Sequence, residues 1–580
     1  MIDRLHHRGW HYLLLIGISG IMFFLNLGGA TLWDLDEGCN GGCAWEMMEA
    51  GNWIIPTFNS QLRVDKPTLL YWLQIFSYLG FGVNEFAARF PSALAALVTV
   101  LLAYELARSM FRRTTGLLAG VIVATTPMLC GAARFANPDS LLNCCTVLTL
   151  TVFWLGVIRR GWWWFALLGL TSGLAVLAKG PVGLVLPGTV ITLFLVWERQ
   201  LSIAWDRRWF LTFWSFVLTA LPWYIWVGIE TKGEFLYGFL WKHNIERATS
   251  SMDNHDGFPG YFLAVLFVGT APWSIFLVLA CWFGFWSAIR YPWNLGQGWW
   301  SRASEVGSAA NAPDPCGGGR GETSLTDKPA AYRLLTCWIL VYVLFFSVAR
   351  TKLPAYILPA VVPCTVLIAR LLQRWRIESI RLPGWLVRGS VASLALIGFL
   401  ISLVLAIAGG VGELPLLRGR YFPGLENFGW LGLIPIAAAA ACWRFARARQ
   451  YGRFISAVAV CAILLLGPMA AFGSVLFNHC KAPRGLVEQT DALRRAEDIR
   501  IGCWHVEHLP SLNFYVKRNV EHFCDENALA NFLTSRLRVY VFIPLEDWRR
   551  IEGKMAASAR IIGRQHDMYH HMEVVVVTNQ

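Results

Sequence analysis

Long apolar runs, separated by short polar gaps, form the dominant pattern of this chain. Runs of about 18 or more apolar residues recur through most of its length. A run of that length crosses a bilayer as a helix, whereas buried helices of soluble domains are usually shorter. The pattern therefore predicts an all-α polytopic membrane protein.

The N-terminal charges set the direction of the first span. Arg4 and Arg8 precede the apolar run Trp10–Ala30, and basic residues favour the cytoplasmic side of a membrane. The run is long enough to span and lacks an Ala-x-Ala cleavage site, so we read it as a retained helix and not as a cleaved signal. Residues 31–89, which follow this span, should then form an outer loop on the non-cytoplasmic side of the membrane.

Within this outer loop, Pro67–Phe81 is apolar, short and aromatic. If it crossed the bilayer, the basic residues Arg108, Arg112 and Arg113 would lie outside. We therefore expect it to lie along the membrane interface. Alternation of the later runs then gives about 13 transmembrane helices, with the basic loops inside.

Two segments have a different composition from the transmembrane part, residues 1–477. Residues 287–331 include a stretch rich in Gly, Ser, Ala and Pro, which predicts a flexible cytoplasmic linker. Residues 478–580 are polar and mixed. We expect them to form a separate domain outside the membrane.

Local patterns in this last segment predict its class. Arg538–Pro544 and Met572–Thr578 are β-branched and apolar, which is typical of buried strands. Leu545–Ser558, between them, has helical character. The sequence therefore predicts a small α/β C-terminal extramembrane domain.

Composition supports a membrane protein. Of the 580 residues, 56% are hydrophobic and only 15% are charged, whereas soluble domains carry about 25% charged residues. The net charge of +13 follows from basic cytoplasmic loops more simply than from nucleic-acid binding. Cysteines in the outer segments leave disulfides open there: Cys39, Cys43, Cys480, Cys503 and Cys524.

Several charged residues lie in the short polar segments that are expected on the outer side of the membrane. The Lys and Arg residues among them are unexpected there, because the positive-inside rule places such residues on the cytoplasmic side. A phosphate at headgroup level would explain several cations together, because it needs several Lys or Arg donors. The alternative is that they are interfacial residues reaching toward lipid headgroups. The charged residues in these gaps are Asp36, Glu37, Lys66, Arg89, Arg134, Asp139, Lys179, Arg350 and Lys352.

The carboxylates among them have a separate interpretation. A hydroxyl or amine that attacks an activated sugar needs a base, and Asp36, Glu37 or Asp139 has suitable chemistry. A carboxylate also stabilises positive charge that develops at the sugar carbon. Capping of a helix N-terminus is the alternative for each of them.

Several stretches resemble one family. The chain is similar to the aminoarabinose (lipid A) transferase and protein O-mannosyltransferase-like membrane glycosyltransferases, in order from about Trp33 to Pro363. The stretches that carry the resemblance are Asp36-Glu37, Gly51 to Pro56, Asp65 to Thr68, Arg134 to Asp139, Ala178 to Val182 and Arg350 to Pro359.

The resemblance implies a GT-C fold and the transfer of a sugar from a polyprenyl-phosphate carrier. Transfer would occur at the outer face of a bacterial inner membrane, with inversion, to a lipid, glycan or protein acceptor. It implies Asp36 as the base, with Glu37 and Asp139 as further acidic groups. The implied phosphate-binding residues are Lys66, Arg89, Arg134, Lys179, Arg350 and Lys352, with Tyr356 close by.

The resemblance leaves the metal and the acceptor open. We expect no cofactor to be required, although Asp65 and His243 match positions at which some relatives hold a divalent metal. Gly38-Cys39-Asn40 stands where related chains often have Arg-Tyr, which leaves acceptor contacts open. The sugar is open between a hexose and a pentose.

Two other classes of function compete with this one. A transporter or flippase of lipid-linked sugars would place ionisable residues at the bilayer midplane, and many transporters show internal repeats, which this chain does not. A structural or assembly protein would leave the outer charges unexplained.

Overall fold

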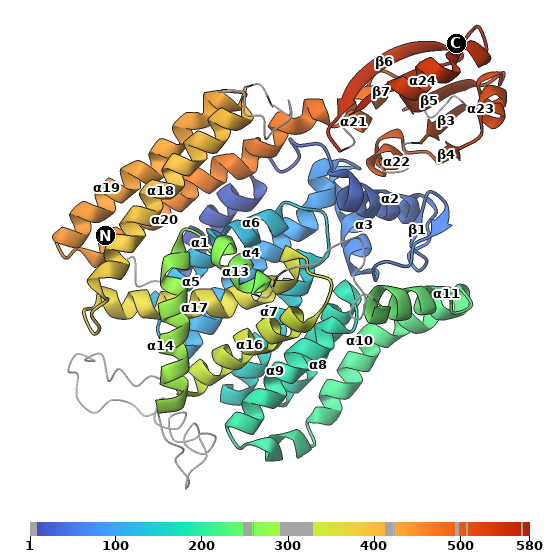
Figure 1. Ribbon diagram of the computed structural model, residues 1–580. Helices are drawn as coiled ribbons and strands as arrows, with labels where there is room; N and C mark the ends of the chain where they lie inside the picture. The colour runs from blue at the N-terminus through green and yellow to red at the C-terminus, as the bar shows by residue number, and fades with distance from the viewer. Residues whose placement is uncertain are drawn as a thin grey trace.

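The computed structural model describes residues 8–159, 161–246, 258, 260–290, 329–411, 422, 424–493, 498–505, 509–569 and 572–580. Most of the expected cytoplasmic linker, namely 291–328, lies outside these residues. Figure 1 shows a large body of helices with a small domain of helices and strands at one end.

The described residues contain ten helices that are long and apolar enough to cross a membrane, or eleven if a bent pair is one span. The bent pair is α5 (Arg113–Ala124) with α6 (Pro127–Ala133), at 64°. The ten are α4 (Glu85–Met110), α7 (Asp139–Arg159), α8 (Trp162–Lys179), α10 (Trp209–Glu230), η6 with α14 (Trp273–Arg290), α16 (Pro329–Val348), η7 with α17 (Pro354–Arg376), α18 (Gly384–Ala408), η9 with α19 (Leu425–Arg447) and α20 with η10 (Tyr451–Cys480).

Shorter apolar helices accompany them, namely α1 with η2 (Gly9–Phe24), α3 (Leu69–Phe81) and α9 (Val182–Trp197). The all-α polytopic class is thus confirmed, while the number 13 and the interfacial position of α3 stay predictions. Between α10 and α14 lie the short elements α11 (Glu234–Leu236), η5 (Tyr237–Glu246) and α13 (Tyr261–Gly269).

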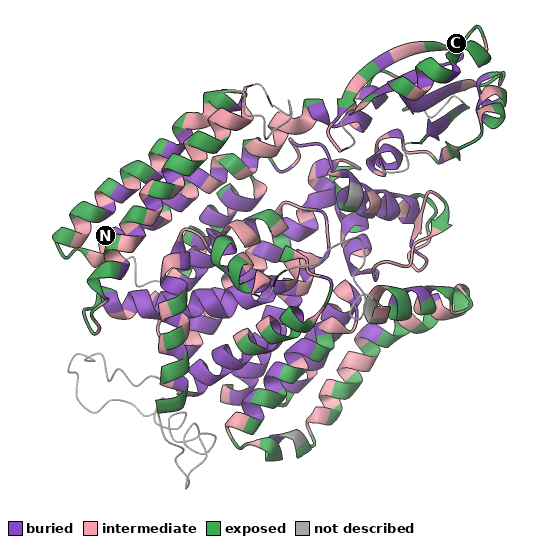
Figure 2. Ribbon diagram, in the orientation of Figure 1, coloured by how far each residue is buried: buried purple, intermediate pink, exposed green. Residues whose placement is uncertain are grey.

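Burial divides the helices into inner and outer ones. α17 (Leu358–Arg376) is buried over nearly its whole length, whereas α18 exposes large apolar side chains such as Leu396 and Phe399; Figure 2 shows this contrast. Apolar side chains on the outside of a membrane helix face lipid without cost. Hence α17 is a central helix and α18 a peripheral one.

Small residues allow a very close contact between α8 and α10. A Cβ at Gly169 of α8 would lie 2.1 Å from the backbone oxygen of Thr212 in α10. Membrane helices pack through such small residues because apolar surface alone gives no preference for protein over lipid. This packing fixes α8, and with it Lys179 at its end.

The first outer loop folds into several short elements. They are η3 (Asp34–Gly38), α2 (Cys39–Glu49), the antiparallel pair β1 (Thr57–Phe58) and β2 (Gln61–Leu62), and α3 (Leu69–Phe81). Most of α2 is buried although it contains Asn40, Gly41 and Gly42, because it lies between α3 and the C-terminal domain (Figure 1). The loop is therefore a packed layer between the membrane helices and this domain.

The C-terminal domain holds a five-stranded sheet of order β4-β3-β5-β7-β6. β3 pairs in parallel with β4 and β5, while β7 pairs antiparallel with β5 and β6. Its elements are α21 (Ala482–Val487), β3 (Ile499–Trp504), α22 (Ser511–Val516), β4 (Val520–Phe523), α23 (Glu526–Leu533), β5 (Arg538–Pro544), α24 (Leu545–Ile551), β6 (Arg560–Asp567) and β7 (Met572–Thr578).

The two predicted strands, β5 and β7, are confirmed at the expected residues. Both are central in the sheet, and apolar cores cover both faces of β5: Phe542 belongs to one core and Val541 to the other. The expected helix from Leu545 is shorter than predicted, since α24 ends at Ile551. All described cysteines are free thiols, so none of the open disulfides forms among them.

Candidate active site

A cavity of about 220 Å³ lies where the outer loop meets the ends of the membrane helices. Its walls come from the outer loop, the start of α7, the end of α8, η5, and the segment joining α16 to α17. Its ionisable lining residues are Asp36, Asp65, Lys66, Asp139, Lys179, His243 and Tyr356. Seven of the residues singled out in the sequence therefore converge on one cavity.

Lys179 and Asp139 form the central ion pair of this cavity. Lys179 Nζ contacts Asp139 Oδ1 and lies 4.9 Å from the centre of the Tyr356 ring. Lys179 ends α8 because Gly180, at φ +86°, turns the chain out of the helix, a conformation that favours glycine. The pair holds a cation beside an aromatic face at the end of two packed helices.

Asn137 orients Asp139. Its Nδ2 donates to Asp139 Oδ2 at 3.0 Å, and its Oδ1 accepts from the backbone N–H of Asp139 at 3.1 Å. Asn137 also lines the cavity, although it was not among the predicted site residues. The only sequence signal for this role is the Asn-Pro-Asp stretch. An Asn side chain commonly hydrogen-bonds to the backbone two residues further on.

Lys66 and Asp36 face the cavity from the outer loop. Lys66 Nζ lies 3.8 Å from Asp36 Oδ1, and the Asp36 side chain is 51% exposed. Burial lowers the pKa of Lys66, and the charge of Lys179 adds to this effect against the opposing field of Asp36. A desolvated ammonium gains from a further anion, as a substrate phosphate would supply.

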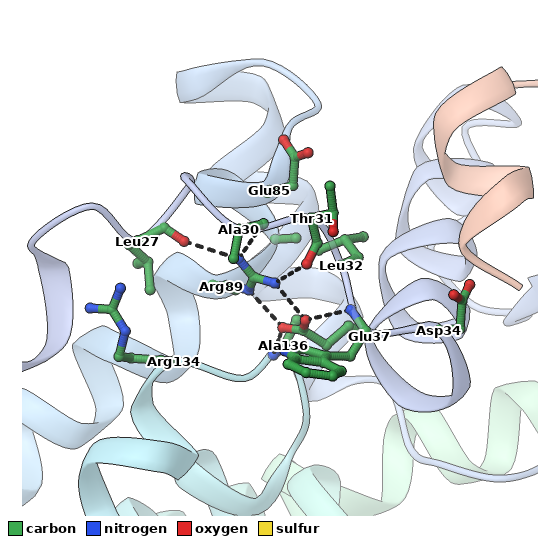
Figure 3. A network of polar contacts seen from close by, with 12 residues as sticks. Leu27, Ala30, Thr31, Leu32, Asp34, Glu37, Glu85, Arg89, Arg134 and Ala136 are labelled. Atoms are coloured by element: carbon green, nitrogen blue, oxygen red, sulfur yellow. Dashed lines mark hydrogen bonds and ion pairs between the residues drawn. The ribbon is translucent and has the colours of Figure 1, made fainter. Parts of the chain in front are cut away.

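Glu37, the neighbour of Asp36, is turned away from the cavity into a buried ion pair with Arg89. Arg89 donates from Nε to Glu37 Oε1 at 2.8 Å and from Nη2 to Oε2 at 2.6 Å. The same carboxylate accepts the backbone N–H of Trp33 at 2.9 Å and of Ala136 at 2.7 Å. Figure 3 shows this network. Glu37 thus ties the outer loop to α4 and to the segment before α7.

The remaining donors of Arg89 are also occupied. Nη1 donates to the backbone oxygens of Leu27 and Ala30, and Nη2 also donates to that of Thr31. A guanidinium has five N–H groups, and these contacts use all five. The structure therefore corrects two expectations: Arg89 is not placed to hold a carrier phosphate, and Glu37 is not placed to act on an acceptor.

Three other predicted cations do not line the cavity. Arg134 donates to the backbone oxygens of Phe23 and Asn26, each at 3.2 Å, apart from the Glu37–Arg89 network in Figure 3. Arg350 is exposed and Lys352 is half-buried. Thr351, between these two, does line the cavity, so Arg350 and Lys352 flank its rim.

Asp65 and His243 come together as the resemblance implied. Their Oδ1 and Nε2 atoms lie 3.1 Å apart, and Asp65 Oδ2 lies 3.4 Å from Arg63 Nη2. In the part of the chain that the structure describes, no third His, Cys, Asp or Glu joins them, whereas zinc in proteins takes three or four protein ligands. The two residues alone do not fit a closed metal site.

Aromatic residues complete the cavity. Phe239 of η5, Phe345 and Phe346 of α16, and the Tyr356 ring all line it. The Tyr356 ring faces the Lys179 ammonium, and the three Phe side chains line the same cavity as Lys66 and Lys179. The cavity is therefore suited to a ligand with an anionic centre and an apolar part.

The fold and this cavity define a class of protein, namely a polytopic membrane protein with its polar site at the ends of its helices. A family model described as dolichyl-phosphate-mannose-protein mannosyltransferase matches residues 65–226. ArnT from Cupriavidus metallidurans bound to undecaprenyl phosphate has the same fold, with a TM-score of 0.73 at 19% identity over 99% of this chain and 98% of that one.

Two curated relatives share the description undecaprenyl phosphate-alpha-4-amino-4-deoxy-L-arabinose arabinosyl transferase. The one from Erwinia tasmaniensis is 28% identical over 62% of this chain, and the match covers 59% of that relative's length. The one from Yersinia pestis is 26% identical over 72% of this chain and 68% of the relative. The chain is therefore similar in sequence to the aminoarabinose transferases, and it shares the fold of one of them.

Proposed function

We propose that this protein transfers a sugar from a polyprenyl-phosphate carrier to an acceptor, with inversion at the anomeric carbon. The observation that carries the proposal is the convergence of Asp36, Asp139, Lys66 and Lys179 on one cavity with aromatic walls. The named relatives act with undecaprenyl-phosphate aminoarabinose. A pentose, aminoarabinose, is therefore the donor sugar that we propose.

Asp36 is the proposed general base. Its side chain lines the cavity and is half exposed, so an acceptor hydroxyl can reach it. The acceptor oxygen attacks the anomeric carbon, its proton passes to the Asp36 carboxylate, and the bond from that carbon to the phosphate oxygen breaks. Such proton transfer contributes about 10²- to 10⁴-fold to a rate.

Lys66 and Lys179 are the proposed partners of the leaving phosphate. Preorganised cations stabilise charge that develops on a leaving group. Asp139, held by Asn137, keeps Lys179 in place before the donor enters. Arg350 and Lys352 at the rim are proposed as further phosphate donors, whereas Arg134 and Arg89 serve the frame of the site.

The prenyl chain would follow the apolar side of the cavity. Phe239, Phe345 and Phe346 line it there, and α3 of the outer loop exposes Phe76 and Leu79. We propose that the cavity and the C-terminal domain face the periplasm and that the N-terminus is cytoplasmic, in a bacterial inner membrane. Lipid A is the acceptor to examine first, with another glycan or a protein as alternatives.

The proposed reaction does not use a metal. Asp65 and His243 supply only two donors, and Arg63 already lies beside Asp65. Activity that persists after dialysis against a chelator would agree with this. Activity that is lost with the chelator and returns with a divalent cation would assign these two residues to a metal.

The test is a transfer assay in proteoliposomes with radiolabelled undecaprenyl-phosphate aminoarabinose and lipid A. Asp36→Asn should lose at least about 100-fold in rate, while Asp498→Asn, an exposed carboxylate of the C-terminal domain, should keep the wild-type rate. Movement of intact donor across the bilayer without cleavage would favour the flippase alternative. An Asp36→Asn variant that transfers at the wild-type rate would remove Asp36 from the mechanism.

A further inference from the structure

A second, larger cavity of about 510 Å³ lies at the other end of the membrane helices. Two separate turns form it: the one between α17 and α18, and the one between α19 and α20. In Figure 1 the α18–α20 layer extends from the side of the C-terminal domain to this far end. The cavity therefore belongs to neither the active site nor the C-terminal domain.

Helix α17 connects the two cavities. Tyr356 and Pro359 at its start line the active-site cavity, and Trp375 near its end lines the second one. The 19 residues of α17 span roughly 28 Å at 1.5 Å per residue, close to the thickness of the bilayer hydrocarbon. The second cavity thus lies at the opposite membrane surface.

The second cavity is strongly basic. Arg381, Arg388, Arg447 and Arg449 line it, against one acid, Glu378. Arg388 donates from Nε to the backbone oxygen of Gly384 at 3.2 Å in its own helix. The Arg447 guanidinium lies 4.7 Å from the centre of the Trp443 ring. Both side chains keep further N–H groups for a ligand.

Arg381 and Arg449 have more donors available. Within the described residues, neither side chain makes a hydrogen bond or an ion pair with the protein. They come from different turns but face the same cavity. The positive-inside rule accounts for arginines in such turns, but it does not require arginines from two turns to share one cavity.

The floor and the surroundings of the cavity are apolar and aromatic. Trp375 is 3% exposed and packs on Tyr451, with ring centres 4.5 Å apart at 32°. Ile380, Leu382 and Val387 line the walls. Trp443, which also lines the cavity, is 41% exposed, as is typical of tryptophans at the membrane interface.

We infer that this cavity binds the phosphodiester headgroup of an anionic phospholipid in the leaflet opposite to the active site. Basic pockets between membrane helices at this depth bind anionic headgroups. Guanidinium groups suit a phosphodiester because each can donate two parallel hydrogen bonds. The apolar walls and exposed Trp443 favour a phosphate that carries acyl chains over free inorganic phosphate.

The test uses the full-length protein in detergent, titrated with phosphatidylglycerol and observed by native mass spectrometry. The double variant Arg381→Ala/Arg449→Ala should bind the lipid about tenfold more weakly or worse. Arg207→Ala/Arg444→Ala removes the same charge from exposed residues that do not line the cavity and should bind as wild type. The charge-conserving variant Arg381→Lys/Arg449→Lys should recover part of the affinity for the lipid. An unchanged gel-filtration profile of each variant is the control for folding.

Three results would overturn the inference. The first is equal loss of lipid in the Arg207→Ala/Arg444→Ala control. The second is equal retention of phosphatidylcholine, whose headgroup has no net charge. The third is displacement of phosphatidylglycerol by inorganic phosphate at the same concentration, which would assign the site to a soluble phosphate.

Discussion

Asp34 Oδ1 accepts a hydrogen bond of 3.0 Å from the backbone N–H of Ser511, which lies 477 residues further along the chain. The Asp34 backbone N–H also donates to Tyr569 Oη at 3.2 Å. Two residues later the outer loop reaches Asp36, the proposed base. The C-terminal domain is therefore in direct contact with the segment that carries the proposed chemistry.

Lys481 and Asn478 extend this contact at the end of η10. Lys481 Nζ donates to the backbone oxygen of Thr31 at 3.0 Å and lies 3.6 Å from the centre of the Trp33 ring. Asn478 Oδ1 accepts the backbone N–H of Thr31 at 2.9 Å. We infer that the C-terminal domain holds the outer loop in its working conformation.

The first prediction concerns pH. Burial raises the pKa of Asp34 from 3.8 to about 7, so the folded state binds this proton more tightly than the unfolded state. The stability of the docked loop should therefore be highest below about pH 4 from this group alone, and should fall as pH rises toward 7, by at most about 4 kcal/mol. Above pH 7 this contribution should change no further.

The measurement is the Tm of the detergent-purified protein at pH 5 and at pH 8. Asp34→Asn keeps an oxygen for the Ser511 N–H and cannot ionise, so it should reduce the difference between the two Tm values. Asp498→Asn is the matched control, since Asp498 is exposed. An unchanged pH dependence in Asp34→Asn would show that Asp34 does not carry this proton.

The second prediction concerns the buried Glu37–Arg89 pair. Arg89→Lys keeps the charge but cannot make five hydrogen bonds, so Glu37 loses its bidentate partner. Removing one partner of a buried pair typically costs about 3 to 5 kcal/mol. We expect Arg89→Lys to lower the free energy of unfolding by an amount that approaches this range. Thermal unfolding in detergent measures the change, and Arg453→Lys, at an exposed position, is the control. A stable Arg89→Lys variant with a raised KM for the donor would instead place Arg89 at the phosphate.

The third prediction concerns Lys179. Lys179→Met should lower kcat by about 10²- to 10³-fold, because a preorganised charge at the leaving phosphate is lost. Lys232→Met removes an exposed lysine near the end of α10 and should leave kcat unchanged. Single-turnover rates with saturating donor separate kcat from binding. A variant with weaker donor binding but unchanged kcat would assign Lys179 to ground-state binding alone.

The fourth prediction concerns Gly38, which follows the acidic pair. A Cβ there would lie 2.4 Å from the backbone nitrogen of Ser511, so Gly38→Ala must push the outer loop and the C-terminal domain apart. Overpacking of this kind typically costs about 1 to 3 kcal/mol, and we expect transfer activity to fall with membrane insertion intact. Gly17→Ala in α1, where a Cβ meets open space, is the control. Wild-type activity in Gly38→Ala would show that this contact does not position Asp36.

The membrane helices and the two central strands could be predicted from local sequence. A bilayer demands a minimum apolar length, so runs such as Phe90–Ala107, within α4, predict spans from composition alone. β5 and β7 are continuous apolar runs because both faces are covered. The edge strands β4 and β6 are largely exposed or half-buried, and β3 is interrupted by the exposed Arg500, so none of the three is a continuous apolar run.

The candidate site was predicted in part. Lys66, Asp139 and Lys179 stand in short gaps at helix ends, and helices that span one bilayer bring such gaps to one surface. Asn137 was missed because its bond to Asp139 resembles any local turn. Asp34 and Lys481 were missed because their partners lie more than 400 residues away in the chain, where no periodicity relates them.

The sequence by itself determined the class of protein and the ionisable residues that line the cavity, because apolar length and loop charge act locally. Only the tertiary structure decided which charges face a substrate. Asp36 and Glu37 are neighbours with the same chemistry, yet Asp36 lines the cavity while Glu37 is bound by Arg89, 52 residues later. In an irregular loop, long-range packing sets the direction of each side chain, and no local pattern encodes it.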